Sequence, residues 1–101
     1  MNADVRLKVS GNTKAIPVVI LEHLDFKNVM RFKNGEWSKT FLNFPIDTDK
    51  KLDFALLCAG IPFQECKVTV TIRVGNKTKS KESTDIFGPK GWAIIKDELK
   101  L

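Results

Sequence analysis

Hydrophobic and polar residues alternate over much of the chain, and this period of two predicts β-strands. Residues 5–9 alternate in this way, and Ser10-Gly11-Asn12 after them is typical of a turn. Residues 15–21 are apolar and β-branched around Pro17, which favours a sheet edge or a bulge. The clearest strand is 66–74, where one parity is apolar and the other is polar: Cys66, Val68, Val70, Ile72 and Val74 against Lys67, Thr69, Thr71 and Arg73.

Asn34-Gly35 predicts a two-residue hairpin, because both central positions of a type I′ turn need a positive φ. The resulting register pairs Lys33 with Glu36 and Phe32 with Trp37. One face of the hairpin is then mostly polar, and the other begins with an aromatic pair. The register is therefore self-consistent.

Residues 49–59 show a helical pattern. Leu52, Leu56 and Ala59 share one helical stripe, and a capping Asp or Thr precedes the segment. The Gly60-Ile61-Pro62 sequence that follows is typical of a helix end, with glycine in the left-handed conformation and proline preventing continuation. The sequence therefore predicts one central helix at about 49–59.

The segment after residue 74 is rich in lysine and raises a question of register. A tight turn at Gly75-Asn76 would place Lys77, Lys79 and Lys81 on the core face, where burial of ammonium groups is costly. We therefore expect residues 76–84 to form a long mobile basic loop, or a short edge strand protected by its lysines.

A last strand at 92–96 and a frayed helical end at 97–101 complete the predicted elements. The order of strands, one helix and further strands predicts a single β-rich α+β domain over residues 1–101. A small antiparallel barrel or highly curved sheet with a central helix fits this order, as in the oligonucleotide/oligosaccharide-binding (OB) fold. An open α+β sheet with the helix on one face fits nearly as well.

Composition adds few constraints. A chain of 101 residues with 43% hydrophobic and 29% charged residues is globular, and no apolar run approaches the roughly 20 residues that span a bilayer. The first ten residues lack the apolar core of a signal peptide, so we expect an intracellular, cytoplasmic protein of viral or bacterial type.

The residues with reactive side chains indicate no catalytic site. Cys58 and Cys66 lie in apolar surroundings at a spacing that matches no common metal site, so we expect two reduced, buried thiols. His23 is the single histidine, and neither a phosphate loop nor a nucleophile motif is present. We expect a protein that is not an enzyme and that holds neither a metal nor a cofactor.

Charge is unevenly distributed along the chain. The 17 Lys and Arg exceed the 12 Asp and Glu by five, and residues 66–81 hold five basic residues without an acid. The remaining 12 basic and 12 acidic residues cancel. The whole excess of +5 therefore lies on one predicted strand and the segment after it, an arrangement suited to a polyanion.

These observations lead to a first hypothesis, the binding of single-stranded nucleic acid by a basic surface beside aromatic rings that stack on bases. Trp37 lies beside the predicted hairpin turn, and Trp92 lies beside a Gly-Pro-Lys-Gly turn. The predicted nucleic-acid site consists of Lys67, Arg73, Lys77, Lys79, Lys81, Trp37 and Trp92.

The alternative is a protein–protein interaction module, such as an inhibitor, an adaptor or an assembly subunit, including viral ones. Pro17 indicates a strand at a sheet edge, and an exposed edge can pair with a strand of a partner. An acidic protein could use the same lysines, and association into a homo-oligomer through the edge is a variant of this hypothesis.

Overall fold

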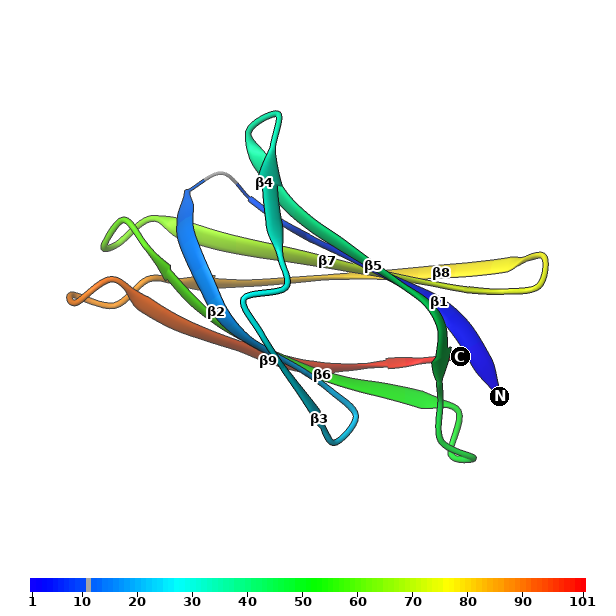
Figure 1. Cartoon of the computed structure of the whole chain (residues 1–101). Coiled ribbons are helices and arrows are strands. Elements are labelled where there is room, and N and C mark those ends of the chain that lie inside the picture. The colour runs from blue at the N-terminus through cyan, green and yellow to red at the C-terminus, as the bar shows by residue number, and fades with distance from the viewer. Residues whose placement is uncertain (11) are drawn as a thin grey trace.

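The computed structural model describes residues 1–10 and 12–101, and these residues form nine antiparallel β-strands in two sheets (Figure 1). No helix occurs among the described residues, and thus none that could cross a membrane. In chain order the strands are β1 (Asn2–Val9), β2 (Thr13–Leu21), β3 (Leu24–Lys27), β4 (Arg31–Lys33), β5 (Glu36–Pro45), β6 (Lys51–Gly60), β7 (Glu65–Val74), β8 (Lys77–Ile86) and β9 (Trp92–Lys100).

The two sheets pack face to face as a β-sandwich. Sheet A has the strand order β4-β5-β1-β7-β8, and sheet B has the order β3-β2-β6-β9. The hairpins β2–β3, β4–β5 and β7–β8 each stay within one sheet, whereas every other connection passes from one sheet to the other. In the view of Figure 1, most of sheet A lies above sheet B.

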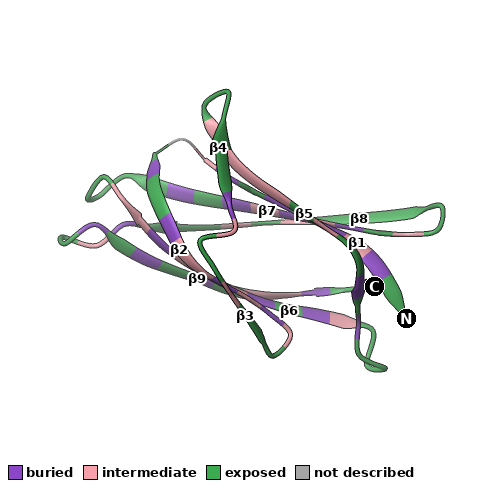
Figure 2. Ribbon diagram, in the orientation of Figure 1, coloured by how far each residue is buried: buried purple, intermediate pink, exposed green. Residues whose placement is uncertain are grey.

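The core lies between the sheets and is built by alternate residues of the central strands. Burial changes from residue to residue along the ribbons, as a period of two requires (Figure 2). The largest fully buried side chains are Phe54, Phe87, Leu7, Leu21, Leu52, Leu56, Ile72, Val5, Val9, Val19, Val68 and Val70.

The predicted helix at 49–59 is wrong, because this segment forms strand β6 in the middle of sheet B. Leu52 and Leu56 point into the core, but so do Phe54 and Cys58 between and after them, which is the pattern of a strand. Neighbouring strands β2 and β9 supply the hydrogen bonds that a helix would have made within itself. Gly60 ends β6 against the ring of Phe87, with which a Cβ atom at this position would clash.

The predicted barrel is also wrong, since the two sheets do not join through backbone pairing among the described residues. At one side the edge strands β8 and β9 are linked by side chains. Lys81 Nζ donates to Asp97 Oδ1 at 3.0 Å and to the Glu98 carbonyl at 3.1 Å, and Ser83 Oγ donates to Asp97 Oδ2 at 3.0 Å. Of the predicted fold class, only the β-rich character is correct.

Several local predictions are confirmed. The β4–β5 hairpin turns at Asn34-Gly35, both with positive φ, and has the predicted register. Strand β7 includes residues 66–74 with the predicted apolar face turned inward. Strand β2 is not an edge strand, but its register shifts near Pro17, as a bulge would. In the turn predicted at residues 10–12, Gly11 lies outside the described residues.

The lysine-rich segment adopts the register that the sequence analysis disfavoured because of the cost of burying three lysines. Gly75-Asn76 is a two-residue turn, and β8 is a ten-residue strand in which Lys77, Lys79 and Lys81 oppose the inward residues of β7. The cost is avoided because β8 is the edge of sheet A, where Lys77 and Lys79 remain exposed and Lys81 meets a carboxylate. The predicted helical end at 97–101 is wrong too, since β9 continues to Lys100.

Candidate functional site

The five cations predicted to bind nucleic acid point to two different sides of sheet A. Lys67 and Arg73 lie on its outer face, where Lys67 Nζ is 3.6 Å from Glu82 Oε1. Lys77, Lys79 and Lys81 lie on the side of β8 that faces sheet B. The structure therefore divides this set by strand parity, the same period of two that formed the strands.

The two tryptophans lie on β5 and β9, whereas the five cations lie on β7 and β8. Trp37 is half-buried, its Nε1 donates to the Thr13 carbonyl at 2.7 Å, and its ring lies edge-on to Phe32. Trp92 begins β9, opposite Ala59, and its side chain lies half-exposed on the outer face of sheet B. The seven predicted residues are not brought together, and nucleic-acid binding by this set stays a prediction.

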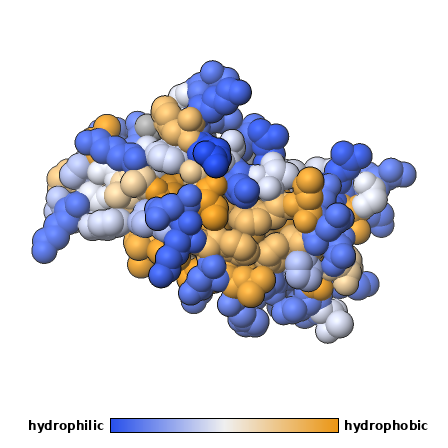
Figure 3. Space-filling view, viewed as in Figure 1, coloured by the Kyte–Doolittle hydropathy of each residue, from blue (hydrophilic) through white to orange (hydrophobic). Residues whose placement is uncertain are grey.

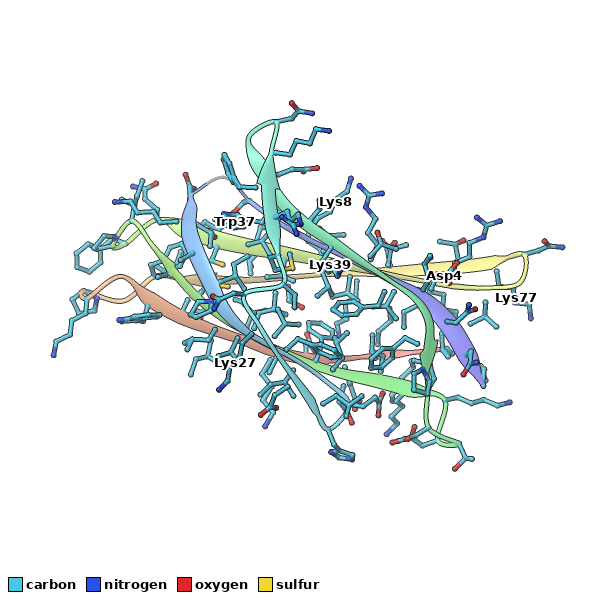
Figure 4. The ribbon with its side chains drawn as sticks, in the orientation of Figure 1. Asp4, Lys8, Lys27, Trp37, Lys39 and Lys77 are labelled. Carbon is cyan, nitrogen blue, oxygen red and sulfur yellow. The ribbon has the colours of Figure 1, made fainter. Side chains whose placement is uncertain are left out.

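The outer face of sheet A is polar and basic. It holds all three arginines of the chain, and in Figure 4 Lys8 points away from the sandwich on this side. Hydroxyl groups lie between the charges, and Thr71 and Ser80 share a hydrogen bond of 2.9 Å. No aromatic side chain stands on this face within the described residues. Its charged members are Arg6, Lys8, Arg31, Lys33, Lys67, Arg73, Asp4, Glu36, Glu65 and Glu82.

The outer face of sheet B is apolar, although no other layer of the described structure covers it. Strand pairing places Val18 beside Leu57 and Leu57 beside Ile94, so one apolar row crosses three strands. Ile94 is 64% exposed and Trp92 is 50% exposed. We call this surface the apolar face, and its members are Val18, Ile20, Ala55, Leu57, Ala59, Trp92 and Ile94.

Charges of both signs surround the apolar face in equal number. The strand registers place Asp25, Asp53, Glu98, Lys27, Lys51, Lys96 and Lys100 at its margins. Glu22, which accepts a hydrogen bond from the Asp53 amide, makes four acids and four lysines. One end of the face is hollowed by a cavity of about 830 Å³ whose lining includes Ile20, Ala55 and Lys96. The surface is therefore apolar in its middle and electrically balanced at its rim.

Glu22 has the most unusual environment in this rim. The Asp53 amide donates to its Oε1 at 3.3 Å, while its Oε2 is buried without a partner among the described residues. Burial, followed by the neighbouring Asp47 carboxyl, raises the pKa of Glu22 to about 7. His23 beside it is exposed. In the described part of the chain, no group of three His, Cys, Asp or Glu residues is placed to hold a metal ion.

The two cysteines are free and buried, as predicted. They extend into the core from different sheets, and the Cys66 sulfur lies 3.6 Å from the Thr13 hydroxyl. A hydrogen bond with Cys66, together with burial, raises the pKa of Cys58. The Cys58 thiol is therefore protonated at neutral pH and packs as a small apolar side chain.

An aromatic cluster fills the open side of the sandwich between β3 and β5. Phe26 lies 4.8 Å from Phe41 and 6.3 Å from Phe44 between ring centroids, and the Lys39 ammonium stands 5.6 Å from the Phe41 centroid. Hydrophobic side chains gather over this part of the visible surface in Figure 3. Since Phe44 is buried and the other two rings are half-buried, the cluster acts as an extension of the core.

Sequence reasoning missed the apolar face, although a signal for it was present. Residues 55, 57 and 59 are as apolar as the inward residues that alternate with them. In the sequence, Leu52, Leu56 and Ala59 of this run also fit a helical stripe, which predicts a helix. Residues 51–60 are instead a strand whose inward side belongs to the core and whose outward side is apolar at the half-buried Ala55, Leu57 and Ala59.

No protein-family model, curated protein or solved structure matches this chain. Its function is therefore argued from its own residues.

Proposed function

We propose that this protein is an interaction module, an assembly subunit that associates with a second copy of itself through the apolar face of sheet B. The observation that carries the proposal is that no other layer of the described structure covers this face, on which Trp92 and Ile94 are exposed and the other members are half-buried. An antiparallel sheet that is open to water on one side usually alternates apolar and polar residues, but β2 and β6 of sheet B are apolar on both sides where Val18 and Ile20 lie beside Leu57 and Ala55. Large exposed apolar patches of this kind mark interaction surfaces.

The outer side of sheet B, which is the apolar face together with its charged rim, is large enough for a dimer. Strands about 4.8 Å apart, mostly nine residues long at about 3.3 Å per residue, give sheet B an outer area of roughly 500 Å². Two such faces together remove about 1,000 Å² from water, which is near the lower limit for a specific interface. Sheets that pack face to face in this way lie about 10 Å apart and interdigitate their side chains.

Charge favours a second copy as the partner. The chain carries +5 overall, so two copies repel each other at most orientations. On the outer face of sheet A six basic side chains exceed four acidic ones, whereas the rim of the apolar face has four of each. The apolar face is therefore where two copies approach with little repulsion. The support is for a sheet face, whereas the sequence analysis favoured a strand edge.

Sedimentation velocity over a wide concentration range tests this proposal. The unmodified protein is expected to form a dimer that dissociates on dilution, and Leu57→Lys, in the middle of the face, is expected to abolish it. Thr40→Lys adds the same charge to the exposed outer face of sheet A and serves as the matched control. A monomer at every concentration, or an equal loss of dimer in both variants, would overturn the proposal.

A second function, the binding of single-stranded nucleic acid, is supported by the three arginines on the outer face of sheet A. Arginine forms bidentate contacts with phosphate, and the hydroxyls between the arginines add donors. Because neither tryptophan stands on this face, a fluorescently labelled oligonucleotide is the suitable probe. Arg6→Gln with Arg73→Gln should weaken binding at low salt, while Lys27→Gln with Lys96→Gln on sheet B should not.

A further inference from the structure

A small pocket lies at the end of the molecule where the tip of the β7–β8 hairpin, the β5–β6 connection and both ends of the chain come together. Figure 1 shows the N- and C-terminal ends at the same end of the sandwich as this hairpin, and Figure 4 places Lys77 there. The pocket has a volume of about 280 Å³ and is lined by Met1, Lys50, Ile72, Val74, Lys77, Lys79 and Leu101.

The floor of this pocket is apolar. Ile72 is 1% exposed and belongs to the core, while Val74 and Leu101 pack against the core half-buried. The Leu101 amide donates to the Lys50 carbonyl at 2.9 Å, which holds the end of the chain beside the β5–β6 connection. An apolar group that entered the pocket would therefore meet an extension of the core.

The rim of the pocket is basic because the β7–β8 register places lysines beside the floor. Lys79 lies opposite Ile72, and Lys77 lies opposite Val74. Lys50 approaches from the β5–β6 connection. No Asp or Glu side chain lines the pocket within the described residues, and all of its charged side chains are lysines.

Lys81 has an ion-pair partner that the lysines of this rim do not have. Lys77, Lys79 and Lys81 point to the same side of β8, and Lys81 donates to a carboxylate, Asp97 Oδ1, at 3.0 Å. Lys50, Lys77 and Lys79 form no ion pair with any described residue. The two lysines nearest the hairpin tip therefore repeat the geometry of Lys81 without the anion that completes it.

We propose that this pocket binds a small amphiphilic anion, with its carboxylate or phosphate at the lysine ammoniums and its hydrocarbon part on Ile72, Val74 and Leu101. The pocket volume equals about nine water molecules at about 30 Å³ each, which fits a chain of roughly eight carbons. A free medium-chain carboxylate and the exposed end of an anionic lipid share this chemistry. The site is separate from the apolar face and does not depend on the proposed self-association.

Titration with octanoate, followed by two-dimensional amide NMR, tests the proposal. Octanoate is expected to shift the amide signals of Ile72, Val74, Lys77 and Lys79, with saturation. Acetate, which has the anion alone, and octanol, which has the chain alone, are expected to bind much more weakly. Flotation with phosphatidylglycerol vesicles then distinguishes a lipid in a bilayer from a free carboxylate, since only the former recruits the protein to the vesicle fraction.

The matched variants remove the same charge from the two sides of one sheet. Lys77→Gln with Lys79→Gln should weaken octanoate binding about tenfold. Lys8→Gln with Lys67→Gln, on the outer face of sheet A, should leave it unchanged. Both pairs are exposed, so folding is retained and is verified by the unperturbed remainder of the spectrum.

Three outcomes would overturn the proposal: equal shifts with acetate, equal losses in both variant pairs, or shifts that map to sheet B. The first two would show general attraction of anions to lysines. Leu57→Lys should retain octanoate binding even where it abolishes the dimer, so failure of this site and failure of self-association are separately visible.

Discussion

The two sheets have similar inner faces and opposite outer ones. Inside, both contribute buried aliphatic side chains to one core. Outside, sheet A presents arginines, lysines and hydroxyls, whereas sheet B presents valine, isoleucine, leucine and tryptophan. Strand alternation explains why each sheet has two distinct sides, but it does not determine which outer side is left without polar residues.

This difference separates the requirements of folding from those of association. Sheet A shows what a stable sandwich needs, namely an apolar inner face and an outer face that water can hydrate. Sheet B has more apolar surface than the fold uses. Since an exposed apolar side chain adds little to the stability of a monomer, the surplus on sheet B supports the proposed self-association.

The largest expected effect is a difference in the free energy of unfolding between substitutions on the two sides of β6. Leu56 is fully buried and Leu57 points outward, so Leu56→Ala should lower the free energy of unfolding by about 3 kcal/mol. Leu57→Ala should lower it by less than about 1 kcal/mol under conditions where the protein is monomeric. Urea unfolding at low protein concentration measures both. Equal losses would mean that the outer side of sheet B belongs to the core.

A second test compares the outer faces directly. Ile94→Glu should weaken the dimer about tenfold or more, because it places a charge on the apolar row. Ser80→Glu introduces the same charge at an exposed position of sheet A and should leave the dimer unchanged. Analytical ultracentrifugation measures the dimer dissociation constants of the two variants. A stronger effect of Ser80→Glu would show that association occurs through sheet A and not through sheet B.

A third test concerns the link between the edges of the two sheets. Lys81→Met keeps the aliphatic stem but removes the bond to Asp97, and should cost about 1 kcal/mol at neutral pH. The Lys81 ammonium lowers the pKa of Asp97, so this stabilisation is present above the ordinary value of 3.8 and is lost as pH falls through the folded-state pKa. Lys79→Met, on the same side of β8 without an ion pair, is the control for thermal unfolding.

The smallest effect concerns Glu22 at the rim of sheet B. Its pKa is raised from 4.5 to about 7, so folding binds a proton between these values. The contribution of Glu22 to stability is therefore fully present below pH 4.5 and is lost as pH rises through 7. Glu22→Gln should raise the melting temperature at about pH 8.5 and change it little at about pH 5.

The matched substitution on sheet A is Glu82→Gln, which breaks the exposed ion pair with Lys67. Its effect on the melting temperature should be small and of the opposite sign to that of Glu22→Gln at high pH. A Glu22→Gln variant that is destabilised at both pH values would show that the carboxylate is needed as the acceptor from the Asp53 amide.

Predictions from the sequence succeeded where neighbouring residues carry the information. The Asn34-Gly35 turn and the 66–74 alternation depend on local geometry, and the structure contains both. The prediction for 49–59 was wrong because its apolar residues satisfy a helical and a strand period at once. Only the presence of β2 and β9 on either side of β6 decides between them.

The candidate surfaces were less predictable for the same reason. The predicted basic site assumed that residues close in sequence lie on one side, but a strand turns alternate residues to opposite sides and a hairpin keeps that alternation. The apolar face assembles residues from β2, β6 and β9, which lie far apart in the chain. No spacing within one segment indicates such a surface.

The strands with clear alternation, the tight turn at Asn34-Gly35, the two buried thiols and the excess of positive charge can all be predicted from the amino-acid sequence alone. The tertiary structure decided which strands are neighbours, which of two apolar sides of β6 enters the core, and that the lysines of β8 stand at an edge rather than inside. The physical reason is that alternation sorts side chains into two sets through local backbone geometry. Which set is buried depends on contacts between distant parts of the chain.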